Sequence, residues 1–432
     1  MEGFYYMDDE LRNYLNQGIS LMTLEKYDKA IPYFNKVIEQ LPRDTEAYFH
    51  LGNAYVNMEK YDDALNIFKK ILIIDKNNAE AYFALGNVEL LMEDNIQAIE
   101  YYNKAENLGY SNADLYEILA NIYLESEDET QALRYLSKAI SKKPFDGELR
   151  LYKIRIYLAD GRFDEALENL DEMERILPDS FEVYNLKSQI LCEKGQFDYA
   201  IETINKGVAR FPNDINILLA RLRLYVKMEK NNEAKKLIQE LKDKGLYEKF
   251  LKDCSLEEAT VYINDKDIDK AISILKNADE KLDDVDIAFV LMDIYSRKNN
   301  FEEVKEYSSK LLNKEIEDFY LANALFLHAT ALENLGEVDL AKKEYKSITT
   351  RLRRITVDNP DFYEGYIFRL LSHTKIGEFE KALELADYLY DLDDEGTDSF
   401  AYKYYIYKEM GDINQAEENK KKALEINPDL VL

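Results

Sequence analysis

An alanine recurs every 34 residues along the first half of the chain, and this spacing constrains the fold more than any other feature. Its first six members are Ala30, Ala64, Ala98, Ala132, Ala166 and Ala200. A fixed period of this length is typical of stacked units, each of which contacts only its neighbours. The 432 residues can therefore form one continuous array, since no single core has to grow with the chain.

Each period has the pattern of two short helices. In the segment 45–78, Tyr48 and Leu51 begin an apolar stripe at helical spacing, and Ala64 and Phe68 begin a second one. The connection between the two stripes is so short that it allows only an antiparallel return. One hairpin of this size cannot bury both stripes alone, so each unit needs neighbours on both sides.

The pattern resembles the tetratricopeptide repeat (TPR), a helix-turn-helix unit of 34 residues. The match in 45–78 comprises Tyr48, Leu51, Gly52, Tyr55, Ala64 and Phe68. The resemblance implies an all-α fold, a right-handed α-solenoid superhelix of twelve tandem helix-turn-helix hairpins. The packing alanine continues beyond the first six repeats as Ala234, Ala271, Ala341, Ala382 and Ala416. We expect small residues on the first helix to face it, namely Gly18, Gly52, Gly86 and Ala120.

The register of the period divides the chain into four segments. Residues 1–10 form a lead or cap, and seven regular repeats occupy 11–241. An irregular joint follows at 242–254, because Ala271 comes 37 rather than 34 residues after Ala234. Five divergent repeats fill 255–432; a further displacement of seven residues precedes the eleventh, and the polar last helix caps the array itself.

The composition limits the classes of partner. A formal charge of −29, from 85 acidic and 56 basic residues, repels nucleic acid and anionic bilayers. No apolar stretch is long enough to span a membrane, and the start lacks the pattern of a secretory signal. The two cysteines fall about two repeats apart, beyond disulfide reach, so we expect reduced thiols and a cytoplasmic location.

Asparagines follow the period on the free face of the first helices. In a TPR superhelix this face lines the concave groove, so the resemblance implies an asparagine ladder there. A carboxamide both donates and accepts hydrogen bonds, which suits sequence-tolerant capture of an extended peptide. The predicted groove residues are Phe49, Asn53, Asn57, Phe83, Asn87, Leu90, Glu117 and Asn121.

Two alternatives remain open for these residues. Asparagine is common at this position of generic TPR sequences, and Phe49 and Phe83 could simply pack adjacent first helices. TPR modules that hold acidic C-terminal tails carry a clamp of lysine, arginine and asparagine residues. Here Leu15, Ile19 and Glu80 stand where such a clamp requires Lys, Arg or Asn, so a basic or mixed peptide fits better than an acidic one.

Other polar clusters favour solvation over chemistry. The cations around Arg353 (Lys342, Lys343, Lys346, Arg351 and Arg354) are interpreted as a solvated helix end, with a docking point for an acidic partner as the alternative. The acidic run from Asp391 to Glu395 is interpreted as a loop. His50, His328 and His373 lie in different repeats, and no nucleotide or nucleophile motif occurs, so we predict no enzyme activity, cofactor or metal.

The sequence therefore predicts a non-catalytic protein–protein interaction scaffold that binds an extended peptide or helix of a partner. An architectural role with self-association is one alternative. A peptide-sensing receptor is another, although the repeats start so early that they leave no room for the effector module that such receptors usually carry.

Overall fold

The structure is a computed structural model that describes residues 9–392 and 397–430. Most of the predicted N-terminal lead and the acidic residues Asp393, Asp394 and Glu395 lie outside this part of the chain. The described residues form 25 helices and no strand, which confirms the predicted all-α array of tandem hairpins. Twenty-four helices make the twelve predicted repeats, and the short helix α15 is additional.

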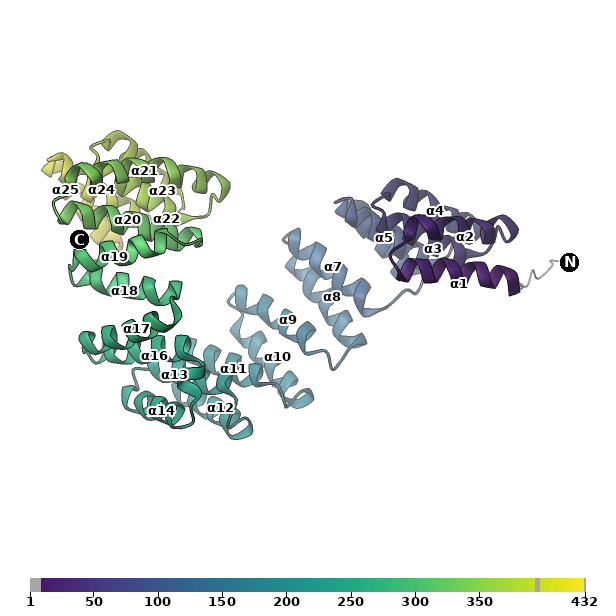
Figure 1. Cartoon of the computed structure of the whole chain (residues 1–432), viewed down its shortest axis with the longest axis horizontal. Coiled ribbons are helices and arrows are strands. Elements are labelled where there is room, and N and C mark those ends of the chain that lie inside the picture. Colours follow the sequence, from purple (N-terminus) through teal and green to yellow (C-terminus); the bar gives the residue numbers. More distant parts are fainter. Residues whose placement is uncertain (1–8, 393–396, 431–432) are drawn as a thin grey trace. The chain divides into compact units, whose positions relative to one another are not determined.

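The chain forms two compact units, which meet in sequence between Gln196 and Phe197. Unit 1 contains the first five hairpins and the first helix of the sixth (Figure 1). Its helices are α1 (Asp9–Thr23), α2 (Tyr27–Gln40), α3 (Thr45–Asn57), α4 (Tyr61–Ile74), α5 (Ala79–Leu91), α6 (Asn95–Asn107), α7 (Ala113–Glu125), α8 (Glu129–Lys142), α9 (Gly147–Ala159), α10 (Phe163–Ile176) and α11 (Phe181–Glu193).

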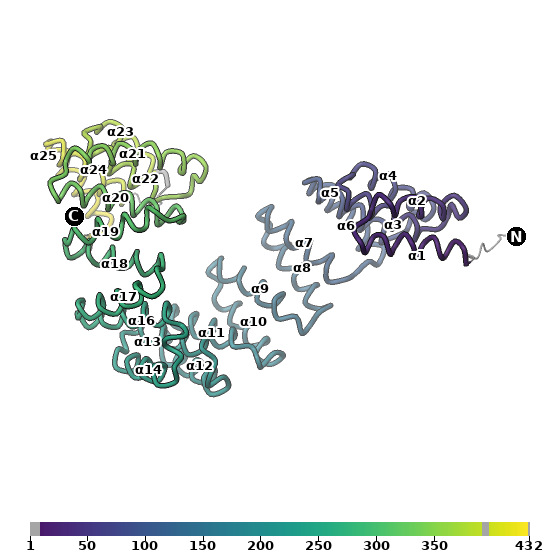
Figure 2. Tube along the Cα trace, in the orientation of Figure 1, coloured from purple at the N-terminus to yellow at the C-terminus, as the bar shows by residue number. Residues whose placement is uncertain are grey.

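Unit 2 starts with the second helix of the sixth repeat and holds the remaining hairpins (Figure 2). Its helices are α12 (Phe197–Arg210), α13 (Ile215–Lys227), α14 (Asn231–Asp243), α15 (Leu246–Lys249), α16 (Leu251–Asn264), α17 (Ile268–Leu282), α18 (Val285–Arg297), α19 (Phe301–Leu312), α20 (Asp318–Asn334), α21 (Val338–Asp358), α22 (Tyr363–Lys375), α23 (Phe379–Leu392), α24 (Thr397–Met410) and α25 (Ile413–Ile426).

Polar caps at the repeat period begin the first helices of unit 1. The side chains of Asp44, Asn78, Asn112 and Asp146 each accept a hydrogen bond from the backbone N–H three residues later, at 2.9–3.1 Å. These bonds satisfy donors that have no partner inside the helix. The period therefore encodes where each first helix starts as well as how it packs.

Close contact between paired helices depends on glycine in the first three repeats. A Cβ atom on Gly52 would lie 2.4 Å from the ring of Phe68, and one on Gly86 would lie 2.6 Å from that of Tyr102. The repeat alanines are buried, as Ala64 illustrates. The closest contact of the glycine is nevertheless with the aromatic ring four residues beyond the alanine.

Two later repeats divide a similar volume differently between the two helices. In the fourth repeat the equivalent pair is Ala120 and Leu136, both fully buried. In the ninth repeat the large residue moves to the first helix, because Met292 and Ser308 occupy these positions, both also buried. These repeats keep a similar combined size with different residues, whereas the fifth and seventh repeats hold two large buried residues, Ile154 with Leu170 and Leu222 with Ile238.

The predicted joint at 242–254 contains α15, which lies within unit 2. Gly245 takes a left-handed conformation with φ of 67° and thereby allows the chain to turn from α14 into α15. The carboxylate of Glu258, only 5% exposed, accepts hydrogen bonds from Lys242 at 2.8 Å and from Tyr247 at 2.5 Å. These contacts tie the extra helix to both of its neighbours.

Helix α21 is 21 residues long, whereas the other second helices contain 12 to 15 residues. Its apolar stripe continues through Ile348 and Leu352, both fully buried. The seven-residue displacement in the sequence is therefore accommodated by additional helix rather than by a loop.

Candidate functional site

The three ladder asparagines lie on α3, α5 and α7, each directly after the small residue at the closest helix contact. Asn53 and Asn121 are exposed, and Asn87 is half-buried. Because Gly52, the neighbour of Asn53, is buried, the ladder position begins where the packed surface ends. This placement puts a polar amide at the edge of each hairpin core.

Two of these amides are oriented by tyrosine hydroxyls. Tyr102 donates to Oδ1 of Asn87 at 2.8 Å, and Tyr152 donates to Oδ1 of Asn121 at 2.8 Å. Burial raises the pKa of both phenols, so they remain donors at neutral pH. With the oxygen engaged, each amide presents its Nδ2 group, which donates to no other side chain or carbonyl in the described part of the chain.

The other predicted asparagine is used differently. Nδ2 of Asn57 donates to the backbone oxygen of Asn53 at 2.8 Å, one helical turn earlier. Its oxygen stays available as an acceptor. Asn57 therefore complements Asn53 on the exposed face of α3, but its donor is partly occupied.

The predicted aromatic residues take part in packing. The Phe49 ring lies 6.0 Å from Phe68, and the Phe83 ring lies 5.7 Å from Tyr102 and 4.6 Å from Tyr110. Phe49, Phe83 and Leu90 are each partly buried against the core clusters. These contacts account for the aromatics without any ligand, although each side chain keeps some exposed surface.

Carboxylates accompany the ladder. Glu117 is half-buried, and its charge adds to burial in raising the pKa of Tyr152. Glu46 and Glu80 are exposed in the first turns of α3 and α5, and neither forms an ion pair with a described residue. The face is therefore polar with an excess of negative charge.

The same position continues beyond the predicted ladder. Arg155 and Gln189 follow Asn121 at intervals of 34 residues, on α9 and α11, and both are exposed. Gln189 donates to Oδ1 of Asn185 at 2.9 Å. These two residues were not among the predicted groove residues, although the 34-residue spacing alone would have identified them.

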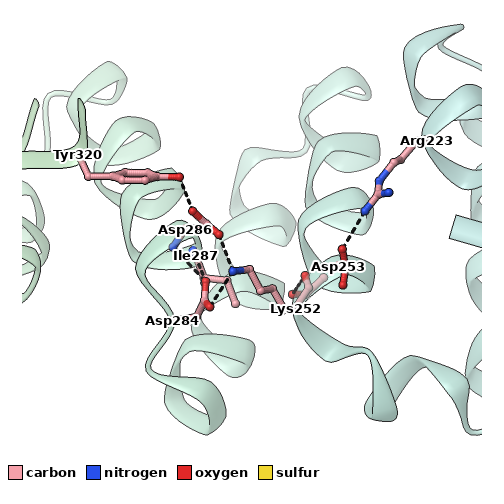
Figure 3. A network of polar contacts seen from close by, with 8 residues as sticks. Arg223, Lys252, Asp253, Asp284, Asp286, Ile287 and Tyr320 are labelled. Carbon is pink, nitrogen blue, oxygen red and sulfur yellow. Dashed lines mark hydrogen bonds and ion pairs between the residues drawn. The ribbon is translucent and has the colours of Figure 1, made fainter. Parts of the chain in front are cut away.

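In the seventh repeat, within unit 2, the equivalent position is occupied by Arg223, and here neighbouring first helices are joined by charge (Figure 3). Arg223 on α13 pairs with Asp253 at 2.8 Å and with Glu257 at 3.2 Å, both on α16. The donor groups of this residue are thus directed at the next first helix. The donors of Arg223 are used within the protein, whereas the Nδ2 donors of Asn87 and Asn121 have no partner among the described residues.

The charged network continues from α16 to α18 and α20. Lys252 lies 2.9 Å from Asp284 and 2.5 Å from Asp286. Tyr320 also donates to Asp286, and this bond raises the pKa of the phenol to about 12. Hydrogen bonds from Lys252 and Tyr320 lower the pKa of Asp286, so its carboxylate is ionised at neutral pH.

Comparison with known protein families agrees with the arrangement of tandem helical hairpins. Two tetratricopeptide repeat models match the sequence, one at residues 21–87 and 123–190 and the other at 79–108 and 405–430. These matched residues belong to tetratricopeptide repeats. A comparison with curated proteins finds no match.

Three solved structures that resemble this chain match different shares of its length. The MamA protein is 27% identical over 38% of this chain and 90% of its own, with a TM-score of 0.34. YrrB, described as a TPR protein with an unusual peptide-binding site, is 26% identical over 44% of this chain and 97% of its own, with a TM-score of 0.34. Yeast Tom70 is 14% identical over 98% of each chain, with a TM-score of 0.46.

The histidines and cysteines of the described chain are buried or half-buried. Burial lowers the pKa of His50, His328 and His373, and among the described residues no three His, Cys, Asp or Glu side chains form a metal-binding group. Cys192 and Cys254 are both buried, and no disulfide joins them. None of the helices in the described ranges is both long and apolar enough to cross a membrane.

Proposed function

We propose that the protein is a non-catalytic scaffold whose first-helix face in unit 1 binds an extended segment of another protein. The observation that carries this proposal is the orientation of Asn87 and Asn121. Each has its oxygen held by a tyrosine at 2.8 Å, and its Nδ2 group donates to no partner among the described residues. Donors fixed in advance lose little freedom on binding, which strengthens an otherwise modest hydrogen bond.

An extended peptide is the ligand that suits such donors. Its backbone carbonyls are present whatever the side chains are, so N–H groups at the repeat period can bind many sequences. Exposed Glu46 and Glu80 add negative charge to the same helices. Asp114, the equivalent residue of the next repeat, is partly neutralised by Lys143 at 2.9 Å. We therefore propose a basic or mixed segment that meets this face in the cytoplasm.

The proposal is tested by selection of peptides from a displayed random library with the full chain as bait. The test variant replaces Asn53, Asn87 and Asn121 with alanine. A matched control replaces the exposed asparagines Asn66 and Asn107, which lie on the second helices α4 and α6. We expect the ladder variant to lose most of the enrichment and the control to retain it. Equal enrichment by both variants would exclude the ladder as the binding determinant.

Self-association is the second candidate, and it rests on exposed apolar side chains. Ile73, Ile96 and Phe145 expose 84, 74 and 75% of their surface, and such groups are frequent at interfaces when they cluster. Light scattering of the purified chain distinguishes the two roles. A concentration-dependent increase in mass that Ile73→Ser and Ile96→Ser abolish would support assembly, and a constant monomer mass would exclude it.

A further inference from the structure

A cavity of about 530 Å³ lies in unit 2, against α21, α22 and α23. It is separate from the ladder, which lies in unit 1. Its lining is dominated by charged and hydroxyl groups rather than by apolar ones. The lining residues are Lys346, Thr349, Thr350, Arg353, Arg369, His373, Glu378, Lys381, Glu384 and Leu385.

The charge of this lining is opposite to that of the whole chain. Four cations face two carboxylates, and one of the carboxylates is already engaged. Glu378 accepts hydrogen bonds from Lys381 at 2.9 Å and from His373 at 2.8 Å. Lys346, Arg353 and Arg369 form no ion pair with any residue in the described ranges. An uncompensated cluster of three cations is unusual in a protein whose net charge is −29.

Arg369 is held in place before any ligand arrives. The residue is half-buried on α22. Its Nη1 group donates to Oγ1 of Thr356 at 2.8 Å, and its guanidinium lies 5.6 Å from the ring centre of Tyr366. Its Nε group is buried without a hydrogen-bond partner in this structure. A fixed guanidinium with unused donors is the arrangement that proteins use to bind oxyanions.

The charges around the cavity also favour an anionic ligand. Burial and the charge of Arg353 lower the pKa of Arg369, which shows that the two guanidinium groups repel each other. An anion placed between them would remove this repulsion and supply acceptors for both. The four cations and two carboxylates leave a net charge of +2 on the lining, which balances the negative charge of a phosphate monoester.

We propose that this cavity is a binding site for a phosphate monoester, with Arg353, Arg369 and Lys346 as its ligands. The phosphoryl group is carried either by a free small molecule or by a phosphorylated side chain of a partner protein, and both present the same oxygens. The volume lies in the range of pockets that hold one small ligand. This site is independent of the peptide-binding face proposed for unit 1.

The additional residues at the end of α21 supply part of this phosphate site. Arg353 and Thr356 belong to the part of α21 that exceeds the normal length of a second helix. Thr356 orients Arg369, and Arg353 contributes a cation directly. The seven additional residues therefore account for two of the groups that distinguish this hairpin pair from the others.

Binding is measured by calorimetry with the full chain at low ionic strength. The probes are O-phospho-L-serine, which represents a free small molecule, and a blocked neutral tripeptide with a central phosphoserine. The test variant is Lys346→Gln with Arg353→Gln; both side chains are exposed, so the fold is retained. The matched control is Lys343→Gln with Arg354→Gln, which removes the same charge from exposed positions of α21 outside the cavity.

We expect at least one probe to bind the wild type, and the test variant to weaken binding by about tenfold or more, since charge-assisted hydrogen bonds are lost. The control should change the dissociation constant less than about threefold, and Glu384→Gln should lower it. The probe that binds tighter identifies the source of the phosphate. Absence of binding by both probes, or equal weakening by the test and control variants, would overturn the proposal.

Discussion

Three repeats of unit 1 and one repeat of unit 2 use the same position differently. In the second to fourth repeats it holds Asn53, Asn87 and Asn121, whose Nδ2 groups donate to no side chain among the described residues. In the seventh repeat it holds Arg223, which pairs with Asp253 at 2.8 Å on the next first helix. The residue directly before this position is buried in both units, as Gly52 and Leu222 show. Packing and surface chemistry are therefore specified independently within one repeat.

This difference shows how a repeat array can contain distinct surfaces. A face whose donors and carboxylates are satisfied internally resists a ligand, because a ligand would have to break ion pairs to bind. A neutral amide whose oxygen alone is engaged still offers its donors. Substitutions in the two units should consequently change different properties.

The largest effect is expected at the tight contact in unit 1. Gly52→Ala places a methyl group 2.4 Å from the Phe68 ring, which should destabilise unit 1 by about 1–3 kcal/mol through overpacking. Chemical denaturation and segment-resolved hydrogen exchange measure the loss, and exchange in unit 2 should stay unchanged. Adding Phe68→Leu reproduces the natural pair Ala120 and Leu136, so the double variant should lose less than the sum of the two single changes. Additive losses would contradict the proposed contact.

The ladder residues should differ among themselves in their effect on stability. Asn87→Leu removes the acceptor of the fully buried Tyr102 hydroxyl, which should cost about 1–2 kcal/mol of the free energy of unfolding. Asn53→Leu breaks no side-chain hydrogen bond within the described structure and should change stability by less than about 0.5 kcal/mol. Denaturant titration of both variants checks the difference. If both variants were equally stable, Tyr102 would not be orienting Asn87.

A smaller effect is expected from the ionic link in unit 2. Lys252→Met keeps the aliphatic stem but removes the pairs with Asp284 and Asp286. Both partners and the lysine are partly solvated, so the loss should be about 0.2–1 kcal/mol and should shrink in high salt. Hydrogen exchange should accelerate at the start of α18. Lys270→Met, an exposed lysine without an ion pair to a described residue, is the control and should leave exchange unchanged.

The smallest effect is a change in pH dependence. Lys310 and Lys314 lie 2.8 and 2.9 Å from the Asp283 carboxylate and lower its pKa to about 2. The folded state then binds fewer protons than the unfolded chain, so this contribution is complete above pH ~4 and is lost as the pH falls toward 2. Asp283→Asn should reduce the slope of unfolding midpoint against pH in this window. Asparagine tolerates the φ of 48° at this position, and an unaltered slope would refute the assignment.

The hairpins were predictable because each rests on local patterns. Tyr48 and Leu51 indicate a helix by their spacing, and Asp44 marks its start. The residue that faces Gly52 was harder to predict, because periodicity gives equivalent positions but not the reach of a side chain across the interface. The ring of Phe68 covers the glycine, while Ala64 only lets the two helices approach.

The candidate sites were predictable to a smaller extent. The ladder follows from a 34-residue spacing, but the bond from Tyr152 to Asn121 joins different repeats and requires knowledge of how their first helices stack. The cations of α21 were interpreted as a solvated helix end. Only the structure shows that Lys346 and Arg353 face Arg369 on α22, whereas Arg354 lies outside the cavity.

The length of α21 has a consequence for how such a chain can acquire new surfaces. Seven residues are nearly two helical turns and about 10 Å of axis, so side chains beyond the addition return to the face that they would otherwise occupy. Tyr345 and Leu352, one heptad apart, are indeed both buried. A helical array can therefore accept whole-turn insertions without losing its stacking, and each insertion adds a short stretch of surface free to diverge from the repeat pattern.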